Sequence, residues 1–168
     1  YVLLAVLIGV LAFFAIMIPI ANYPTPYGDV DASWNYFISN YVRENNKLPD
    51  ILPEFSIFYA NQKYNYPPIT HINIALFGSF LNIPQVYSPY VYIALLHTVI
   101  GFGIYVLVKR HFGDIPAIAS LVFALLSKRL VYSMVSGQWS LYTGLTMLPM
   151  AVFLIIDFYR NQSTKNAI

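Results

Sequence analysis

The sequence predicts an all-α membrane protein with about four transmembrane helices and a long first loop that contains interfacial helices. Of its 168 residues, 58% are hydrophobic and only 10% are charged, whereas soluble domains carry about 25% charged residues. Uncharged runs of membrane-spanning length recur along the chain, and five of the seven acidic residues lie between the first two. This composition excludes a soluble enzyme and a disordered chain. A net charge of +2 does not predict nucleic-acid binding, and the absence of Cys excludes disulfides and thiolate zinc sites.

The first expected span is residues 1–21, which carry no charge. A helix of this length measures about 30 Å, the thickness of the hydrocarbon core. Pro24 and Pro26 follow it and mark its exit. Because the chain starts inside an apolar run and ends without an evident stop, we interpret it as a fragment of a larger transmembrane bundle.

Residues 22–85 form the expected outer loop. Its aromatic-rich composition indicates a structured segment against a membrane rather than a disordered linker. Apolar side chains at helical spacing predict an amphipathic interfacial helix that ends near Asn45. The apolar stretch 69–83 follows two prolines and contains His71 and two asparagines, so we interpret it as a short interfacial or membrane-dipping helix. The apolar face of the predicted amphipathic helix that ends near Asn45 comprises Trp34, Phe37, Ile38, Tyr41 and Val42.

The remaining expected spans are 86–108, 115–135 and 141–158. The uncharged part of the second of these, 115–127, is short, so this helix either runs past Lys128 or ends early beside a cavity. Basic residues follow 86–108 and 141–158, and four spans place both clusters inside. The chain is then a multi-pass plasma-membrane protein whose long first loop is extracytoplasmic, with Lys128-Arg129 facing outward.

Three small features inside or beside these spans have packing interpretations. Gly101 and Gly103 form a small-residue packing patch. His97 lies within a span, where an ionisable residue is a functional candidate, although a neutral His bonded to a neighbouring helix is the simpler interpretation. Trp139 fits an aromatic belt at the membrane surface.

The first candidate for chemistry is the sequence Gly28-Asp29-Val30-Asp31, directly after the first span. Two carboxylates at this spacing could bind one Mg²⁺ or Mn²⁺ ion, or one of them could act as general base on a hydroxyl. The alternative is that Asp29 or Asp31 caps the amphipathic helix. Both interpretations can hold, one for each residue.

Two further candidates are binding residues. Tyr66 and His71 flank a Pro-Pro pair at a helix start, where His71 could bond a phosphate; the alternative is a helix-start turn with a surface His. Lys128 and Arg129, with Gln138 nearby, could hold a lipid-linked phosphate. The alternative for the two cations is anchoring at the interface by snorkelling.

The order of these features resembles the N-terminal part of the GT-C superfamily of integral-membrane glycosyltransferases. It is also similar to prokaryotic membrane proteins related to 6-pyruvoyl-tetrahydropterin synthase. The resemblance covers nearly all of the chain through short motifs. These motifs are Gly28-Asp29-Val30-Asp31, Lys47-Leu48-Pro49, Tyr66-Pro67-Pro68, Phe77-Gly78, Lys109-Arg110-His111-Phe112-Gly113-Asp114, Tyr132-Ser133 and Ser136-Gly137-Gln138-Trp139.

The resemblance implies an enzyme that transfers a sugar from a polyprenyl-phosphate carrier to an acceptor glycan, lipid or protein at the outer membrane face. It assigns the catalytic role to Asp29 or Asp31, as general base or metal ligand. The family has more spans and often a soluble C-terminal domain, and it often has Ser-Pro where this chain has Ser127-Lys128. The alternatives are a non-catalytic membrane module, either a transporter segment or a scaffold for envelope polysaccharide assembly, and an inactive member of the family.

Overall fold

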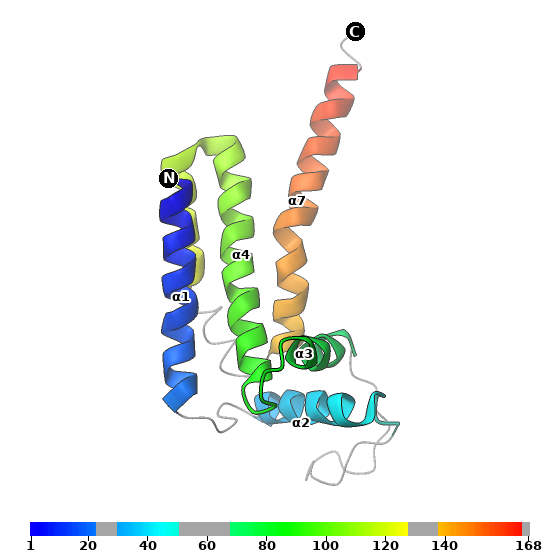
Figure 1. Cartoon of the computed structure of the whole chain (residues 1–168). Coiled ribbons are helices and arrows are strands. Elements are labelled where there is room, and N and C mark those ends of the chain that lie inside the picture. Colours follow the sequence, from blue (N-terminus) through cyan, green and yellow to red (C-terminus); the bar gives the residue numbers. More distant parts are fainter. Residues whose placement is uncertain (23–29, 51–67, 128–137, 166–168) are drawn as a thin grey trace.

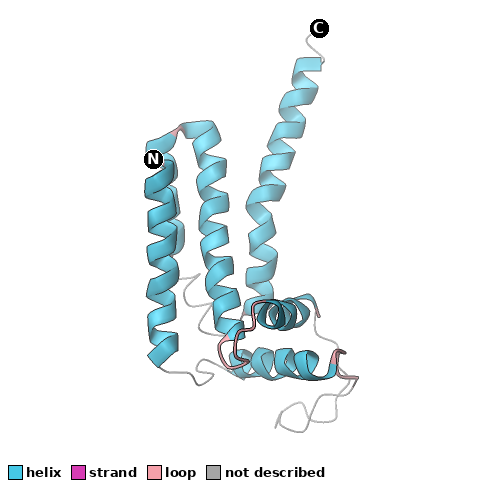
Figure 2. Ribbon diagram, viewed as in Figure 1, coloured by secondary structure: helices cyan, strands magenta, loops and turns pink. Residues whose placement is uncertain are grey.

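The computed structural model describes residues 1–22, 30–50, 68–127 and 138–165. The regular structure of these residues is entirely helical, which confirms the predicted all-α class (Figures 1 and 2). The helices are α1 (Val2–Asn22), α2 (Val30–Asn45), α3 (Ile69–Phe80), α4 (Ser88–Phe112), α5 (Asp114–Leu125) and α7 (Trp139–Lys165).

The helices form an upright bundle with a crosswise layer at one end. Helix α4 packs against α1, α5 and α7, while α2 and α3 pack on each other across the end of the bundle at which α4 begins (Figure 1). The N-terminus and the turn between α4 and α5 lie at the opposite end. The two short helices expected between the first two apolar runs are therefore present as α2 and α3.

Two helices of the described part are long and apolar enough to cross a membrane: α4 over Ser88–Phe112 and α7 over Trp139–Tyr159. Only 11% of the apolar window of α7 is buried, so the described part of the chain leaves most of this helix uncovered. Large apolar side chains such as Leu148 and Leu154 point outward from it. The apolar part of α1 that the structure describes in full, Val2–Ile18, is shorter. The count of four spans stays a prediction.

Helix α5 is shorter than the expected span 115–135. It has 12 residues and ends at Leu125, so it measures about 18 Å. The chain leaves the helix in a tight turn, in which the N–H of Leu126 donates to the carbonyl of Val122 and that of Ser127 donates to Ala124. The short-helix alternative fits this geometry, and residues 128–135 lie outside the described part.

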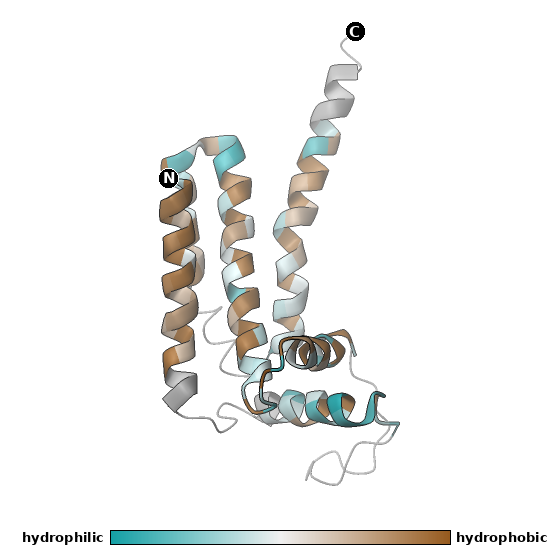
Figure 3. Cartoon of the chain, in the orientation of Figure 1, coloured by the Kyte–Doolittle hydropathy of each residue, from teal (hydrophilic) through white to brown (hydrophobic). Residues whose placement is uncertain are grey.

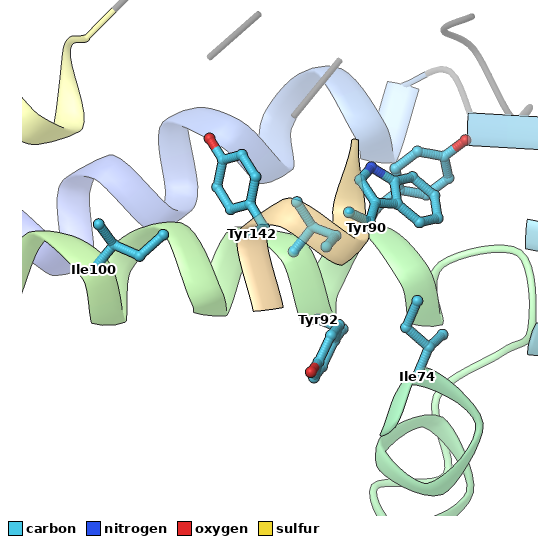
Figure 4. Packing of buried hydrophobic residues seen from close by; sticks show 7 residues of the cluster. Ile74, Tyr90, Tyr92, Ile100 and Tyr142 are labelled. Atoms are coloured by element: carbon cyan, nitrogen blue, oxygen red, sulfur yellow. The ribbon is translucent and has the colours of Figure 1, made fainter. Parts of the chain in front are cut away.

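The first packing core joins α3, α4 and α7 (Figure 4). Its rings include Tyr90 and Trp139, which meet edge to face with centroids 5.8 Å apart. The structure buries Trp139 to 1% exposure, so the expectation of an aromatic-belt position is wrong. The indole ring is instead enclosed where α7 begins. The buried members of this core are Ile74, Tyr90, Tyr92, Ile93, Ile100, Trp139 and Tyr142.

Glycines of α4 allow close helix contacts, as the small-residue patch predicts. A Cβ added at Gly101 would lie 2.9 Å from Cδ2 of Leu125 on α5. One added at Gly103 would lie 3.0 Å from the ring of Pro149 on α7. Gly101 and Gly103 therefore set the approach of α5 and α7 to α4.

The end of the bundle opposite α2 and α3 carries ion pairs. Lys109 bonds Asp114 at 2.8 Å, and the Arg110 guanidinium bonds the Asp157 carboxylate. The same guanidinium lies over the ring of Phe153 at 4.6 Å. Hydrophilic residues concentrate here and on the C-terminal half of α2 (Figure 3). The basic end of α4 and the C-terminal part of α7 therefore share one side of the bundle.

Candidate functional site

The predicted carboxylates lie at the start of α2. This helix begins at Val30, so Asp31 is its second residue, while Asp29 and the side chain of Asp31 lie outside the described part. A carboxylate in the first turn of a helix is favoured by the helix dipole, and the capping interpretation of Asp29 or Asp31 stays a prediction. The described residues contain no group of three or more His, Asp or Glu side chains able to hold a metal ion. The expected Mg²⁺ or Mn²⁺ site therefore depends on residues beyond that part.

His71 is buried between α2 and α3 rather than exposed at a surface turn. Its ring Nε2 lies 2.7 Å from Oδ1 of Asn35, which is itself buried on α2 one helical turn after Asp31. An Nε2–H that donates to this carbonyl oxygen satisfies both groups. Burial lowers the pKa of His71 from 6.5 to about 4, so the ring is neutral at physiological pH. His71 is placed to position the first half of α2, and it brings no positive charge to a phosphate.

Two more polar contacts tie α3 to the bundle. The Thr70 hydroxyl donates to the Thr143 hydroxyl of α7 at 3.1 Å, and the Asn73 amide donates to the Tyr92 hydroxyl of α4 at 3.3 Å. Together with the bond between His71 and Asn35, these contacts link α3 to three different helices. Helix α3 thereby fixes the start of α2 relative to the start of α7.

His97 links α4 to the end of α5 and the first turns of α7. Its Nε2 lies 3.0 Å from the carbonyl oxygen of Leu125, and its Nδ1 lies 3.1 Å from the hydroxyl of Tyr142. A neutral ring satisfies both contacts, because Nε2–H donates to the carbonyl and Nδ1 accepts from the hydroxyl. This arrangement agrees with the interpretation of His97 as a histidine bonded to a neighbouring helix.

The remaining predicted binding residues are only partly described. Gln138 is exposed and directly precedes α7, where its carbonyl oxygen accepts the backbone N–H of Tyr142. Tyr66, Lys128 and Arg129 lie outside the described residues. Their described neighbours in sequence are Pro68 before α3 and Ser127 after α5.

An apolar groove of about 380 Å³ lies between α4 and α7. Its lining includes Phe102 and Val106 on α4, and Met150 and Phe153 on α7. Thr146 also lines the groove, and its hydroxyl donates to the carbonyl oxygen of Thr143. Along α7 the groove begins at Thr146, eight residues after Gln138, which corresponds to about 12 Å of helix.

Sequence reasoning assigned no binding or packing role to Asn35 and Arg43 on α2 or to Lys47 just after it. Asn35 and Ser39 are buried and lie four residues apart, directly beside the apolar stripe of α2. That spacing was a readable signal of a buried polar face. Arg43 donates to the carbonyl oxygen of Ile83 at 2.6 Å, a contact that depends on the fold and has no local signature in the sequence.

No protein-family model, curated protein or solved structure matches the chain. The resemblance to the GT-C superfamily therefore stays a prediction.

Proposed function

We propose that the chain is part of a membrane glycosyltransferase that moves a sugar from a polyprenyl-phosphate-linked donor to an acceptor at the outer membrane face. The observation that supports this most is the arrangement of the described helix ends. The starts of α2, α3 and α7 lie at the end of the bundle at which α4 begins, and each flanks a segment with a candidate residue (Figure 1). Asp31, His71 and Gln138 belong to the described part of this end.

Membrane embedding is supported by the lengths of α4 and α7 and by the outward-facing apolar side chains of α7. The crosswise layer of α2 and α3 then lies at the membrane surface, where a lipid-linked phosphate sits. The apolar groove between α4 and α7 begins about 12 Å along α7 from Gln138 and offers a place for part of the polyprenyl chain.

The proposed chemistry assigns one role to each group. The carboxylate of Asp29 or Asp31 takes the proton of the acceptor hydroxyl as its oxygen attacks the anomeric carbon, and the bond from sugar to phosphate breaks. Lys128 and Arg129 stabilise the negative charge that develops on the leaving polyprenyl phosphate. The carboxylate pair is also the set that would hold Mg²⁺ or Mn²⁺, since oxygen ligands suit these ions.

The distribution of charge favours transfer chemistry over transport. Transporters bind their substrates near the bilayer midplane, where helices break and polar groups converge. Within the described residues, the ion pairs of Lys109 and Arg110 lie at the end of the bundle. Both ring nitrogens of His97, in the middle of α4, are bonded to neighbouring helices.

The test is a pair of single substitutions in the full-length protein, Asp29→Asn and Asp31→Asn. Membranes with each variant are assayed for transfer of labelled sugar from a polyprenyl-phosphate donor. Loss of a general base lowers the rate by about 10²–10⁴-fold, so we expect at least one variant to lose this much. Asp50→Asn is the matched control, because Asp50 is an exposed carboxylate of the same loop. Full activity of both Asp29→Asn and Asp31→Asn would refute the proposal.

A further inference from the structure

A second cavity, of about 310 Å³, lies between the C-terminal part of α2 and α3. Arg43 and Lys47 line it from the α2 side, and Ile72 and Leu76 line it from α3. We propose that this cavity binds the phosphate group of an anionic membrane phospholipid.

The cavity is built for a negative charge. The described residues that line it include two cations, an amide and a hydroxyl, but no carboxylate. The nearby carboxylate of Glu44 instead accepts a bond from the Gln85 amide at 3.1 Å. An anion in this cavity would therefore meet Arg43 and Lys47 without competition from an acidic residue of the described lining.

The fold holds both cations at the cavity wall. One N–H of the Arg43 guanidinium donates to the carbonyl oxygen of Ile83. This bond uses one of the five N–H donors of the guanidinium and leaves the others able to bind phosphate oxygens. After α2 the chain turns at Asn46, whose φ of 53° lies in the left-handed region. This turn brings Leu48 back against the cluster of Ile38, Val42 and Ala75 and places Lys47 over the cavity.

The other lining residues indicate that the phosphate belongs to a lipid. Leu76 lines the cavity and is 64% exposed. It shares α3 with Ile69 and Phe80, which are also exposed and lie at helical spacing from it. A free phosphate ion would make no apolar contact with the strip of Ile69, Leu76 and Phe80, whereas the acyl chains of a phospholipid would cover it. The volume lies at the low end for ligand pockets and suits a head group rather than a whole lipid.

This site requires membrane contact of α2 and α3 but does not depend on the proposed sugar transfer. Asp29 and Asp31 lie at or before the start of α2, whereas Arg43 and Lys47 lie at its end and just beyond it. If the protein transfers no sugar but binds the anionic lipid, only the transfer proposal fails. If it transfers sugar but shows no preference for the anionic lipid, only the lipid proposal fails.

The test is lipid binding by the full-length protein in detergent, measured by native mass spectrometry. The protein is titrated with phosphatidylglycerol or with phosphatidylcholine of the same chain length. We expect tighter binding of phosphatidylglycerol, and we expect Lys47→Gln to weaken it about fivefold, the effect of one cation beside an anionic lipid. Lys47→Glu should abolish the preference. Arg43→Gln is the second variant, although it also removes the bond to Ile83.

Lys109→Gln is the matched control, because Lys109 lies at the opposite end of the bundle beside Asp114. It should leave the phosphatidylglycerol preference unchanged. Equal binding of the two lipids, or equal effects of Lys47→Gln and Lys109→Gln, would overturn the proposal. Inorganic phosphate is titrated as a competitor: displacement of the lipid at equal phosphate concentration would show a free-phosphate site and would also overturn it.

Discussion

Acidification should loosen the packing of α2 on α3 through His71. The imidazole is buried, its Nε2 bonds Asn35 at 2.7 Å, and burial lowers its pKa from 6.5 to about 4. In the opened state the ring reaches water and titrates near 6.5. Between these two values the opened state takes up a proton that the packed state does not, so acid favours opening.

The size of the effect follows from the two pKa values. Because the packed-state pKa lies below the open-state pKa, the stability contribution is fully present above pH 6.5 and is lost as the pH falls toward 4. Each pKa unit corresponds to about 1.4 kcal/mol, so the complete loss is about 3 kcal/mol. At pH 5 the loss is about 2 kcal/mol, which is about a thirtyfold increase in the open population.

Hydrogen exchange of the α2 and α3 amides measures this opening in the detergent-solubilised protein at pH 7.5 and pH 5, after correction for intrinsic exchange rates. His71→Gln is the matched variant, because its amide can still donate to Asn35 but does not titrate. We expect the protection of α2 and α3 to fall with pH in the wild type and to stay constant in His71→Gln. The reasoning is refuted if wild-type protection is the same at both pH values, or if His71→Gln shows the same fall.

Two further predictions concern helix contacts. Gly78→Ala should lower the free energy of unfolding by about 1–3 kcal/mol in a thermal unfolding assay, because the new Cβ would lie 2.6 Å from a side-chain carbon at the start of α4. Gly144→Ala is the control: its Cβ meets open space within a helix, so this variant should be neutral or stabilising in the same assay. Tyr142→Phe removes the hydroxyl that bonds His97 and should cost about 1–3 kcal/mol, seen as faster exchange of the α4 and α7 amides around that contact. Unchanged exchange would show that this bond contributes little.

The helices could be predicted because their signals are local. Uncharged runs of sufficient length predict α1 and α4, and the 3.6-residue repeat of apolar side chains predicts α2. The prolines and the asparagines of the stretch 69–83 predict a short helix, and α3 has 12 residues. These patterns depend on neighbours along the chain, so no knowledge of the fold is needed to read them.

The surroundings of individual side chains could not be predicted in the same way. His71 follows two prolines in a short polar-flanked stretch, which is typical of a surface turn, yet it is buried and bonds Asn35 of another helix. Trp139 precedes an apolar run, which is typical of a membrane belt, yet it is buried and packs against Tyr90. In both cases the decisive partner lies dozens of residues away. The candidate carboxylates, Asp29 and Asp31, were predicted from their spacing of two residues, which does not say what they face.

Helix α3 explains how the candidate site is held together. Residues 70, 71 and 73 project in different directions, because successive side chains on a helix are rotated by about 100°. Their polar groups bond α7, α2 and α4 respectively, so α3 cannot shift along one neighbour without breaking a bond to another. The start of α2, with Asp31, is thus fixed to the start of α7, next to Gln138, through two hydrogen bonds and one short helix. If Asp31 is a catalytic carboxylate, its position depends on a neutral His71. The opening of α2 from α3 between pH 6.5 and about 4 should then lower the rate of sugar transfer.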